Sequence, residues 1–341
     1  MEHQVTLFKG EQMEELVRNY FLTLGYYVVR GIKYKYEGIE ITDVDVYLYM
    51  RSSTLSRERI NVDLKNKKSP QTFERILWAN GLRKLLGFDS CIVATTDQRP
   101  VIHSYGQLHE TTILDGAFLA KLKTSNITNR LTEEDLLLEL SKCKSYKTFA
   151  NRDWRYIYDL GKSRLLSEQD FSGFNATLET LRYFVEKVIV DDQKRTIATR
   201  MVYITLSQLL IIIDYIIKDI AFLEQPIREK VLSDGFKFGN LGKGGADKIL
   251  AIATQISGNK SSQEFLRSLD NIPTDILKEF FGKNDNVRNL FQWAKELEAH
   301  GFNREFIDPN QIDTALKGIL SVILDFTNVD RKKFFNAYGG T

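Results

Sequence analysis

The stretch ITDVDVYLYMRSSTLSRERINVDLK, residues 41–65, alternates polar and apolar side chains on both sides of a polar segment. Successive side chains of a β-strand point to opposite faces, so this period of two predicts two strands joined by a turn over residues 51–59. Asp45 lies on the charged face of the first strand, and Asp63 and Lys65 share a face of the second. Each predicted strand therefore gathers its charged residues on one side.

Helices and further strands are predicted around these two strands. An amphipathic helix ends at Gly25, and a second helix begins after Pro70 and ends at Gly87. We expect an α/β fold, a mixed sheet flanked by helices, with residues 101–122 adding edge elements. The predicted order is helix, strand, strand, strand, helix, strand, over residues 11–24, 26–33, 41–50, 60–65, 71–86 and 91–95.

The pattern changes near residues 123–130, and beyond it only helices are predicted. Thr132, followed by three acidic residues, is typical of a helix start. We therefore predict an α/β domain over residues 1–125 and a mostly α-helical carboxy-terminal domain over residues 130–341. Recognition, oligomerisation and regulation are all open as functions of the second domain.

Composition narrows the class of protein. The net charge of +2, from 47 basic and 45 acidic residues, means that any nucleic-acid surface must be local. Two cysteines are too few for a disulfide framework, and the polar amino terminus lacks the apolar run of a secretory signal, so we expect a cytoplasmic protein. The apolar stretch at residues 201–223 contains Asp214, Lys218 and Asp219, which favours a buried helix over a membrane span.

Asp45 and Asp63 are suited to hold one divalent cation if their strands pair antiparallel. Hydrolysis of a phosphodiester requires cations that neutralise the phosphate oxygens and supply hydroxide near neutral pH. Mg²⁺ prefers oxygen ligands and is usually held by one or two carboxylates. Lys65, two residues after Asp63, projects from the same face and can stabilise developing negative charge.

These residues resemble a known family. Val44-Asp45 and Asp63-Leu64-Lys65, preceded by a helix that contains Met13-Glu14 and stops at Gly25-Tyr26, resemble the PD-(D/E)XK nuclease superfamily, which has the restriction-endonuclease-like fold. The resemblance covers residues 10–100, under a third of the chain. Val44 replaces the usual proline, and the second acid is aspartate rather than the commoner glutamate.

The resemblance implies a function for each matched residue. Asp45 would be the motif aspartate, Asp63 the second acid and Lys65 the motif lysine, while Leu64 would offer its backbone carbonyl to the metal. Glu14 matches the acid that many members carry on the first helix, with Glu11 and Glu15 as alternatives. The implied metal ligands are therefore Asp45, Asp63, Leu64 and Glu14.

The implied activity is that of a cytoplasmic endonuclease that cleaves DNA with Mg²⁺ or Mn²⁺. Members of the superfamily serve restriction, antiphage defence, repair and mobile elements, and the resemblance does not choose among these or between DNA and RNA. A homodimer is expected if a protein with one site cuts both strands. No membrane partner is expected.

Several alternatives stay open. Asp43, Asp45, Asp63 and Lys65 could form a solvated sheet face with cross-strand ion pairs, although a sheet covered on both sides rarely keeps such a face. The chain could be a non-catalytic module that binds nucleic acid or protein, or an effector subunit that a partner protein activates. Asn66, Lys67 and Lys68 could contact phosphates or be plain surface charge.

Overall fold

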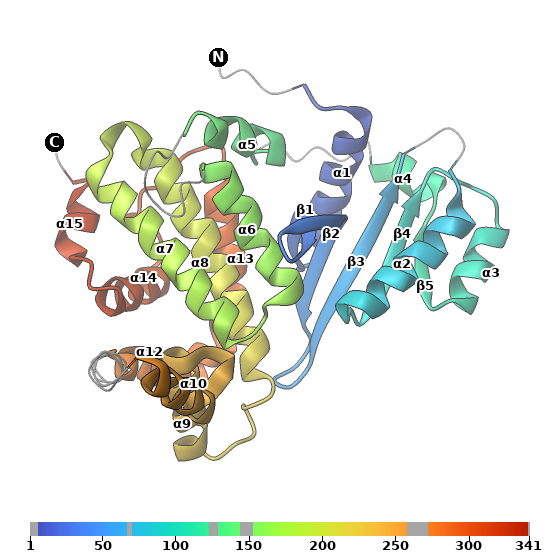
Figure 1. Cartoon of the computed structure of the whole chain (residues 1–341). Helices are drawn as coiled ribbons and strands as arrows, with labels where there is room; N and C mark the ends of the chain where they lie inside the picture. Colours follow the sequence, from blue (N-terminus) through green and yellow to red (C-terminus); the bar gives the residue numbers. More distant parts are fainter. Residues whose placement is uncertain (1–5, 67–69, 123–128, 144–152, 258–271, 340–341) are drawn as a thin grey trace. The chain divides into compact units, whose positions relative to one another are not determined.

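A computed structural model describes residues 6–66, 70–122, 129–143, 153–257 and 272–339 (Figure 1). The chain forms two compact units. Unit 1 contains residues 1–167 and 302–305, and unit 2 contains residues 168–301 and 306–341. The division therefore falls after Ser167 and not near residues 125–130, because helices α5 (Glu133–Ser141) and α6 (Trp154–Ser167) belong to unit 1.

Unit 1 is built on a mixed sheet of five strands in the order β1-β2-β3-β4-β5. β1, β2 and β3 are antiparallel neighbours, whereas β3, β4 and β5 run parallel. The predicted α/β class with a mixed sheet is confirmed. The strands are β1 (Tyr27–Tyr36), β2 (Ile39–Arg51), β3 (Arg57–Lys65), β4 (Ser90–Thr95) and β5 (Thr111–Leu114).

Helices cover both faces of this sheet. α1 (Lys9–Thr23) and α4 (Gly116–Leu122) pack on one face, where Val17, Val46 and Val62 lie in the core. α2 (Thr72–Leu86) and α3 (Val101–Leu108) pack on the other, where Ile76 and Val93 are buried. The alternation in residues 41–65 therefore sends its apolar side chains toward α1 and its polar side chains toward α2.

Glycines end the two helices that flank the site-forming strands. Gly25 has φ +89° and Gly87 has φ +63°, a left-handed conformation that glycine adopts without the steric cost of a Cβ atom. Each glycine lets the chain reverse directly into the next strand, as the sequence predicts. The predicted start at Thr132 is also confirmed, since its hydroxyl accepts a hydrogen bond of 3.1 Å from the Asp135 N–H.

Unit 2 consists of helices in its described residues. Its longest helix, α8, is buried along most of its length, which agrees with a buried helix in the apolar stretch at residues 201–223. The described helices are α7 (Phe171–Val190), η2 (Asp192–Lys194), α8 (Arg195–Ile217), α9 (Gln225–Phe238), η3 (Gly239–Leu241), α10 (Gly242–Ser257), α12 (Thr274–Gly282), α13 (Asn284–Phe302), α14 (Thr314–Phe326) and α15 (Arg331–Asn336).

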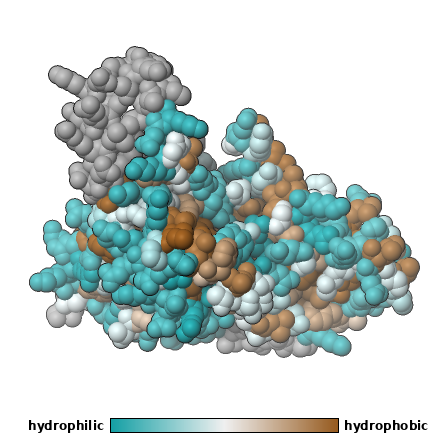
Figure 2. Space-filling model, turned by 90° about the horizontal axis from the view of Figure 1, so that it is seen from below, coloured by the Kyte–Doolittle hydropathy of each residue, from teal (hydrophilic) through white to brown (hydrophobic). Residues whose placement is uncertain are grey.

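Within the described residues one helical stretch, Asp192–Ile217, is long and apolar enough to span a membrane. However, 89% of its most apolar window is buried inside the protein. The face of the molecule drawn in Figure 2 is largely hydrophilic, with smaller apolar areas between the polar ones. The apolar helix therefore fits the core of a soluble protein.

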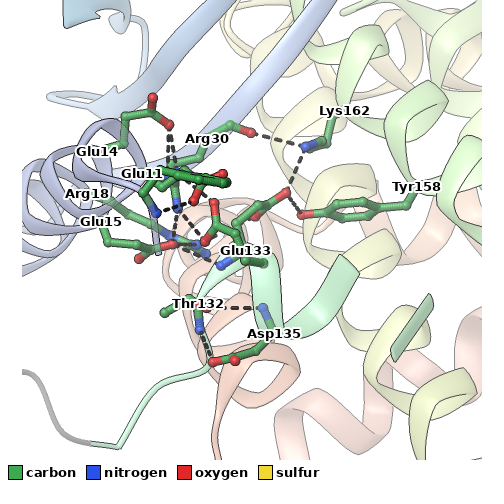
Figure 3. Close-up of polar contacts among 12 residues, drawn as sticks. Glu11, Glu14, Glu15, Arg18, Arg30, Thr132, Glu133, Asp135, Tyr158 and Lys162 are labelled. Atoms are coloured by element: carbon green, nitrogen blue, oxygen red, sulfur yellow. Dashed lines mark hydrogen bonds and ion pairs between the residues drawn. The ribbon is translucent and has the colours of Figure 1, made fainter. Parts of the chain in front are cut away.

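Arg30 places a guanidinium group inside unit 1, between β1, α1 and α5 (Figure 3). The residue is 2% exposed. Its Nη2 donates to Glu14 at 2.7 Å and to Glu134 at 3.1 Å, and its Nη1 donates to Glu15. A buried cation is tolerated only when carboxylates surround it, so Arg30 requires both helices to stay against β1.

A second buried charge, Glu133, connects α5 to α6. Glu133 Oε1 accepts hydrogen bonds from Lys162 Nζ and from the Tyr158 hydroxyl, both at 2.7 Å. Burial disfavours the carboxylate, but the charges of Lys162 and Arg18 hold the pKa of Glu133 well below its usual value. Lys162 also donates to the Arg30 carbonyl at 3.2 Å. These contacts, drawn in Figure 3, explain why α5 and α6 belong to unit 1.

Replacement of Arg30 tests this buried network. Arg30→Ala leaves three carboxylates without their shared cation, and we expect the free energy of unfolding to fall by about 3–5 kcal/mol. Urea denaturation measures the change. Lys142→Ala is the control, because Lys142 and its partner Glu139 are 60% and 51% exposed and should contribute less than about 1 kcal/mol. Equal effects of the two substitutions would contradict a stabilising network at Arg30.

Candidate active site

The pairing between β2 and β3 stops where the candidate residues begin. Paired positions run from Arg51↔Arg57 to Val46↔Val62. Beyond that point β2 stays paired with β1, and β3 stays paired with β4 as far as Lys65↔Thr95. Asp45 on β2 and the Asp63-Leu64-Lys65 segment on β3 thus lie on the two sides of one opening in the sheet ladder.

The Asp45 carboxylate bridges this opening. Its Oδ2 accepts a hydrogen bond of 2.6 Å from the Leu64 N–H, a donor that the sheet ladder would otherwise use. Burial raises the pKa of Asp45 to about 6, while the Leu64 hydrogen bond and the charges of Arg75 and Lys65 lower it. The nearby Asp43 carboxylate raises it further. No described residue forms an ion pair with Asp45.

Asp63 has a partner, Arg75, that the sequence did not predict. Its Oδ2 accepts a hydrogen bond of 2.8 Å from Arg75 Nε, and Arg75 Nη2 forms an ion pair with its Oδ1. Asp63 is 7% exposed, whereas the Arg75 side chain is 24% exposed. Arg75 therefore neutralises one of the two acids to which the sequence assigns a metal.

Hydrogen bonds from Thr72 hold the first turn of α2 against the end of β4, and this attachment positions Arg75. The Thr72 hydroxyl lies 3.1 Å from the Thr95 hydroxyl at the end of β4 and donates to Asp97 Oδ2 at 2.9 Å. Asp97 also accepts hydrogen bonds from Arg99, which hold its pKa well below the usual value. Since Arg75 lies one turn after Thr72, this attachment holds its guanidinium over β3.

Among the three acids of α1, Glu14 is the one whose charge acts on the candidate site. Glu11 accepts a hydrogen bond from the Phe8 N–H at 2.8 Å, and buried Glu15 accepts one from the Glu133 N–H at 2.9 Å. Burial raises the pKa of Glu14 to about 7 against the opposing effect of Arg30, and the charge of Asp45 contributes to the rise. Glu14 nevertheless projects from the helix on the opposite face of the sheet from Asp63.

The remaining predicted residues differ in their placement. Lys65 is partly buried at the end of β3, and its charge lowers the pKa of Asp45. Asn66 donates to the Lys9 carbonyl at 2.9 Å, a contact with the start of α1. Lys67 and Lys68 lie outside the described residues. The site therefore contains Asp45, Asp63, Leu64 and Lys65 close together, whereas Glu14 belongs to the helix on the other face of the sheet.

Comparison with known proteins returns no relative for this chain. No protein family, no curated protein and no solved structure matches it. Among the described residues no three His, Cys, Asp or Glu side chains are gathered as a ready metal site.

The sequence contains a weak indication that Arg75 lies near the acids of the site. Ile76 and Ala79 mark the face of α2 that packs on the sheet, and Arg75 precedes the first of them. A basic residue beside the inward face of a helix that follows the DLK segment is a candidate partner for its acid. Helical periodicity places the guanidinium near β3 but cannot select Asp63 over Asp45 or Asp43.

The raised pKa of Asp45 predicts a pH-dependent effect of Asp45→Asn. The folded protein holds the Asp45 proton more tightly than the unfolded chain, so this residue's contribution to stability falls as pH rises through about 6. An uncharged asparagine can still accept the Leu64 hydrogen bond. We expect Asp45→Asn to stabilise the protein at about pH 7.5 by up to about 3 kcal/mol, with the gain vanishing near pH 4.

Denaturation at a series of pH values measures this gain. Asp89→Asn is the matched control, because the exposed Asp89 carboxylate also accepts a backbone hydrogen bond, 2.7 Å from the Arg59 nitrogen. It should give no gain at any pH. A constant difference between Asp45→Asn and the wild-type protein across the series would show that the Asp45 carboxyl is not desolvated.

Proposed function

We propose that this protein is a metal-dependent endonuclease of the PD-(D/E)XK type that hydrolyses DNA phosphodiester bonds. The observation that carries the proposal is the hydrogen bond from the Leu64 N–H to Asp45 Oδ2. It joins the motif aspartate to the centre of the Asp63-Leu64-Lys65 segment. Two strands that are separated in sequence thus bring two acids and one ammonium group to one opening in the sheet.

The electrostatics of this opening support the proposal. Asp45 and Glu14 have pKa values raised to about 6 and about 7, mainly by burial, and the charge of Asp45 contributes to the rise at Glu14. Carboxylates that are desolvated in this way gain from a bound cation, since the cation removes the cost of their ionisation. Strongly shifted pKa values at the meeting point of several charged side chains are typical of functional sites.

The residues fit a divalent cation, with a condition on two of the acids. Asp45 Oδ1 is an oxygen donor of the kind that Mg²⁺ and Mn²⁺ prefer, and the Leu64 carbonyl is a further candidate. Glu14 can offer only its Oε1, because Arg30 holds its Oε2. Asp63 becomes a ligand only if Arg75 releases it. When bound, the cation would polarise the scissile phosphate and supply hydroxide near neutral pH. Lys65 would stabilise the charge that develops on the phosphate.

The cellular setting is part of the proposal. Cys91 and Cys143 are both buried and free, as expected for a protein of the reducing cytoplasm. Restriction, antiphage defence, repair and mobile-element functions all suit a DNA endonuclease of this type. DNA recognition and regulation are the functions that we propose for the helical unit 2.

Cleavage assays on the intact chain test the proposed activity. Supercoiled plasmid, linear DNA and RNA are incubated with the protein and Mg²⁺, Mn²⁺ or a chelator. We expect metal-dependent cleavage of DNA that falls by about 100-fold or more in Asp63→Asn and Lys65→Ala. The first substitution removes a carboxylate ligand of the metal, and the second removes the positive charge that stabilises the transition state. Gel electrophoresis of the products measures the rates.

Glu58→Gln is the matched control for these variants. Glu58 lies on the same strand, β3, but at its start, where its carboxylate accepts a hydrogen bond from the Ser90 hydroxyl. Its replacement should leave cleavage unchanged. Cleavage that survives both Asp63→Asn and Lys65→Ala would refute the assignment of the site.

The ion pair between Asp63 and Arg75 favours a second candidate function. If Arg75 holds Asp63 permanently, the same fold is a non-catalytic module that binds nucleic acid or a partner protein. An effector that a partner activates would instead release Arg75 on binding that partner. Gel-shift assays separate these cases, since the module binds DNA without cleaving it and the effector cleaves only with its partner.

Metal binding by Arg75→Gln distinguishes the two states of Asp63. Without the guanidinium, Asp63 is free to ligate, and we expect Mn²⁺ to bind the variant about tenfold more tightly than the wild-type protein. The free Mn²⁺ signal in electron paramagnetic resonance measures the affinity. Arg83→Gln, in the same helix, is the control, because Arg83 pairs with Glu110 away from the site. Unchanged Mn²⁺ affinity in Arg75→Gln would favour the non-catalytic module.

A further inference from the structure

The outward face of α2 is unusually apolar for a surface helix. Leu77, Trp78 and Leu85 are 53%, 49% and 62% exposed. Single exposed apolar residues are common, but these three occupy one face of a helix of 15 residues together with Gly81. A contiguous apolar patch of this kind marks an interaction surface.

No contact with a described residue explains why position 81 is a glycine. It lies in the middle of α2, where glycine weakens a helix relative to alanine. A Cβ atom at this position would meet nothing within 4 Å, so no described neighbour requires the small residue. A second backbone that approaches α2 closely at Gly81 would require it.

The residues around Gly81 are arranged symmetrically. Leu77 and Leu85 lie four positions before and after it, and Trp78 and Lys84 lie three positions before and after it. All of them are exposed, and they share one side of the helix. In an antiparallel pair of identical helices that cross at Gly81, each residue faces the one at the equal distance on the other side.

We propose that the outward face of α2 binds the same face of a second copy of this chain, with the two helices crossing antiparallel at Gly81. Leu77 of each copy then packs on Leu85 of the other, and Lys84 of each lies over the ring of Trp78 of the other. Such a twofold contact is self-complementary, because one surface serves both copies. Cation–π and apolar contacts stabilise it together.

The charged residues of this face favour the antiparallel orientation and a second copy of the chain as the partner. Glu74 is exposed one turn before Trp78, so the antiparallel crossing brings Lys84 of one copy close to Glu74 of the other. A parallel pair would set Lys84 against Lys84 and Glu74 against Glu74. The patch thus carries its own complementary charge, and a second copy satisfies it without any further partner.

The size of the surface sets the expected affinity. A helix of 15 residues is about 22 Å long and about 10 Å wide. A contact made by this helix alone is smaller than the roughly 800 Å² per partner of a stable interface. We therefore expect a dimer that dissociates on dilution in the micromolar range. It forms whether or not the protein cleaves DNA, and in a nuclease it would unite two sites in one particle.

Sedimentation of the full chain over a range of concentrations tests the dimer. The wild-type protein should pass from monomer to dimer, and Leu77→Asp and Leu85→Asp should each weaken association about tenfold or more. Leu108→Asp is the matched control, since Leu108 on α3 is 76% exposed but lies on another helix. A wild-type chain that stays monomeric at high micromolar concentration overturns the proposal, as does a dimer that neither aspartate weakens.

Disulfide trapping tests the crossing point. Gly81→Cys should form a covalent dimer under mild oxidation, because the two positions meet at the crossing. Lys84→Cys should not, since the crossing separates its two copies by about 9 Å along the helices. The native Cys91 and Cys143 are buried and give little background. Efficient trapping of Lys84→Cys with none of Gly81→Cys would overturn the antiparallel crossing.

Discussion

Burial of the Arg30 guanidinium is the constraint on which the organisation of unit 1 depends. A cation with 2% exposure must be surrounded by acceptors, and its acceptors come from α1 and from the helix that begins after Thr132. Two segments more than 100 positions apart are thereby held on one strand. The same contact holds Glu14 so close to Asp45 that the charge of Asp45 raises the pKa of Glu14. Glu14 therefore belongs both to the ion pairs of Arg30 and to the candidate site. A substitution that disturbs the ion pairs will also affect the site.

The opening between β2 and β3 follows from a single side chain that substitutes for a backbone group. Because Asp45 takes the Leu64 N–H, the ladder ends there while each strand keeps its outer neighbour. The cost is a buried carboxylate, visible in its raised pKa. Arg75 reduces this cost from the α2 side and neutralises Asp63 directly. A divalent cation at the same opening would neutralise Asp63 in place of the guanidinium. In the nuclease interpretation Arg75 and the metal therefore compete for this one acid.

The local part of this arrangement could be predicted from the sequence because it rests on neighbouring residues. Alternation in residues 41–65 requires the chain to put Asp45 and Asp63 on one face, and the β2–β3 register agrees. Gly25 and Gly87 end their helices for steric reasons that hold in any fold. The boundary after Ser167 could not be predicted in this way, since Thr132 is a helix start in either unit. What attaches that helix to unit 1 is the ion pairing of Glu134 with Arg30 on β1 and of Glu133 with Lys162 on α6, which no local pattern encodes.

The sequence by itself determined the strands, the helix ends and the shared face of Asp45, Asp63 and Lys65, because dihedral preferences and side-chain periodicity act over a few residues. Only the tertiary structure decided which groups those residues meet. Asp63 meets Arg75, Asp45 meets the Leu64 N–H, and Glu14 meets Arg30. Each of these pairings depends on how separate elements pack. A buried charge takes the partner that packing brings within reach, and that choice is made in three dimensions.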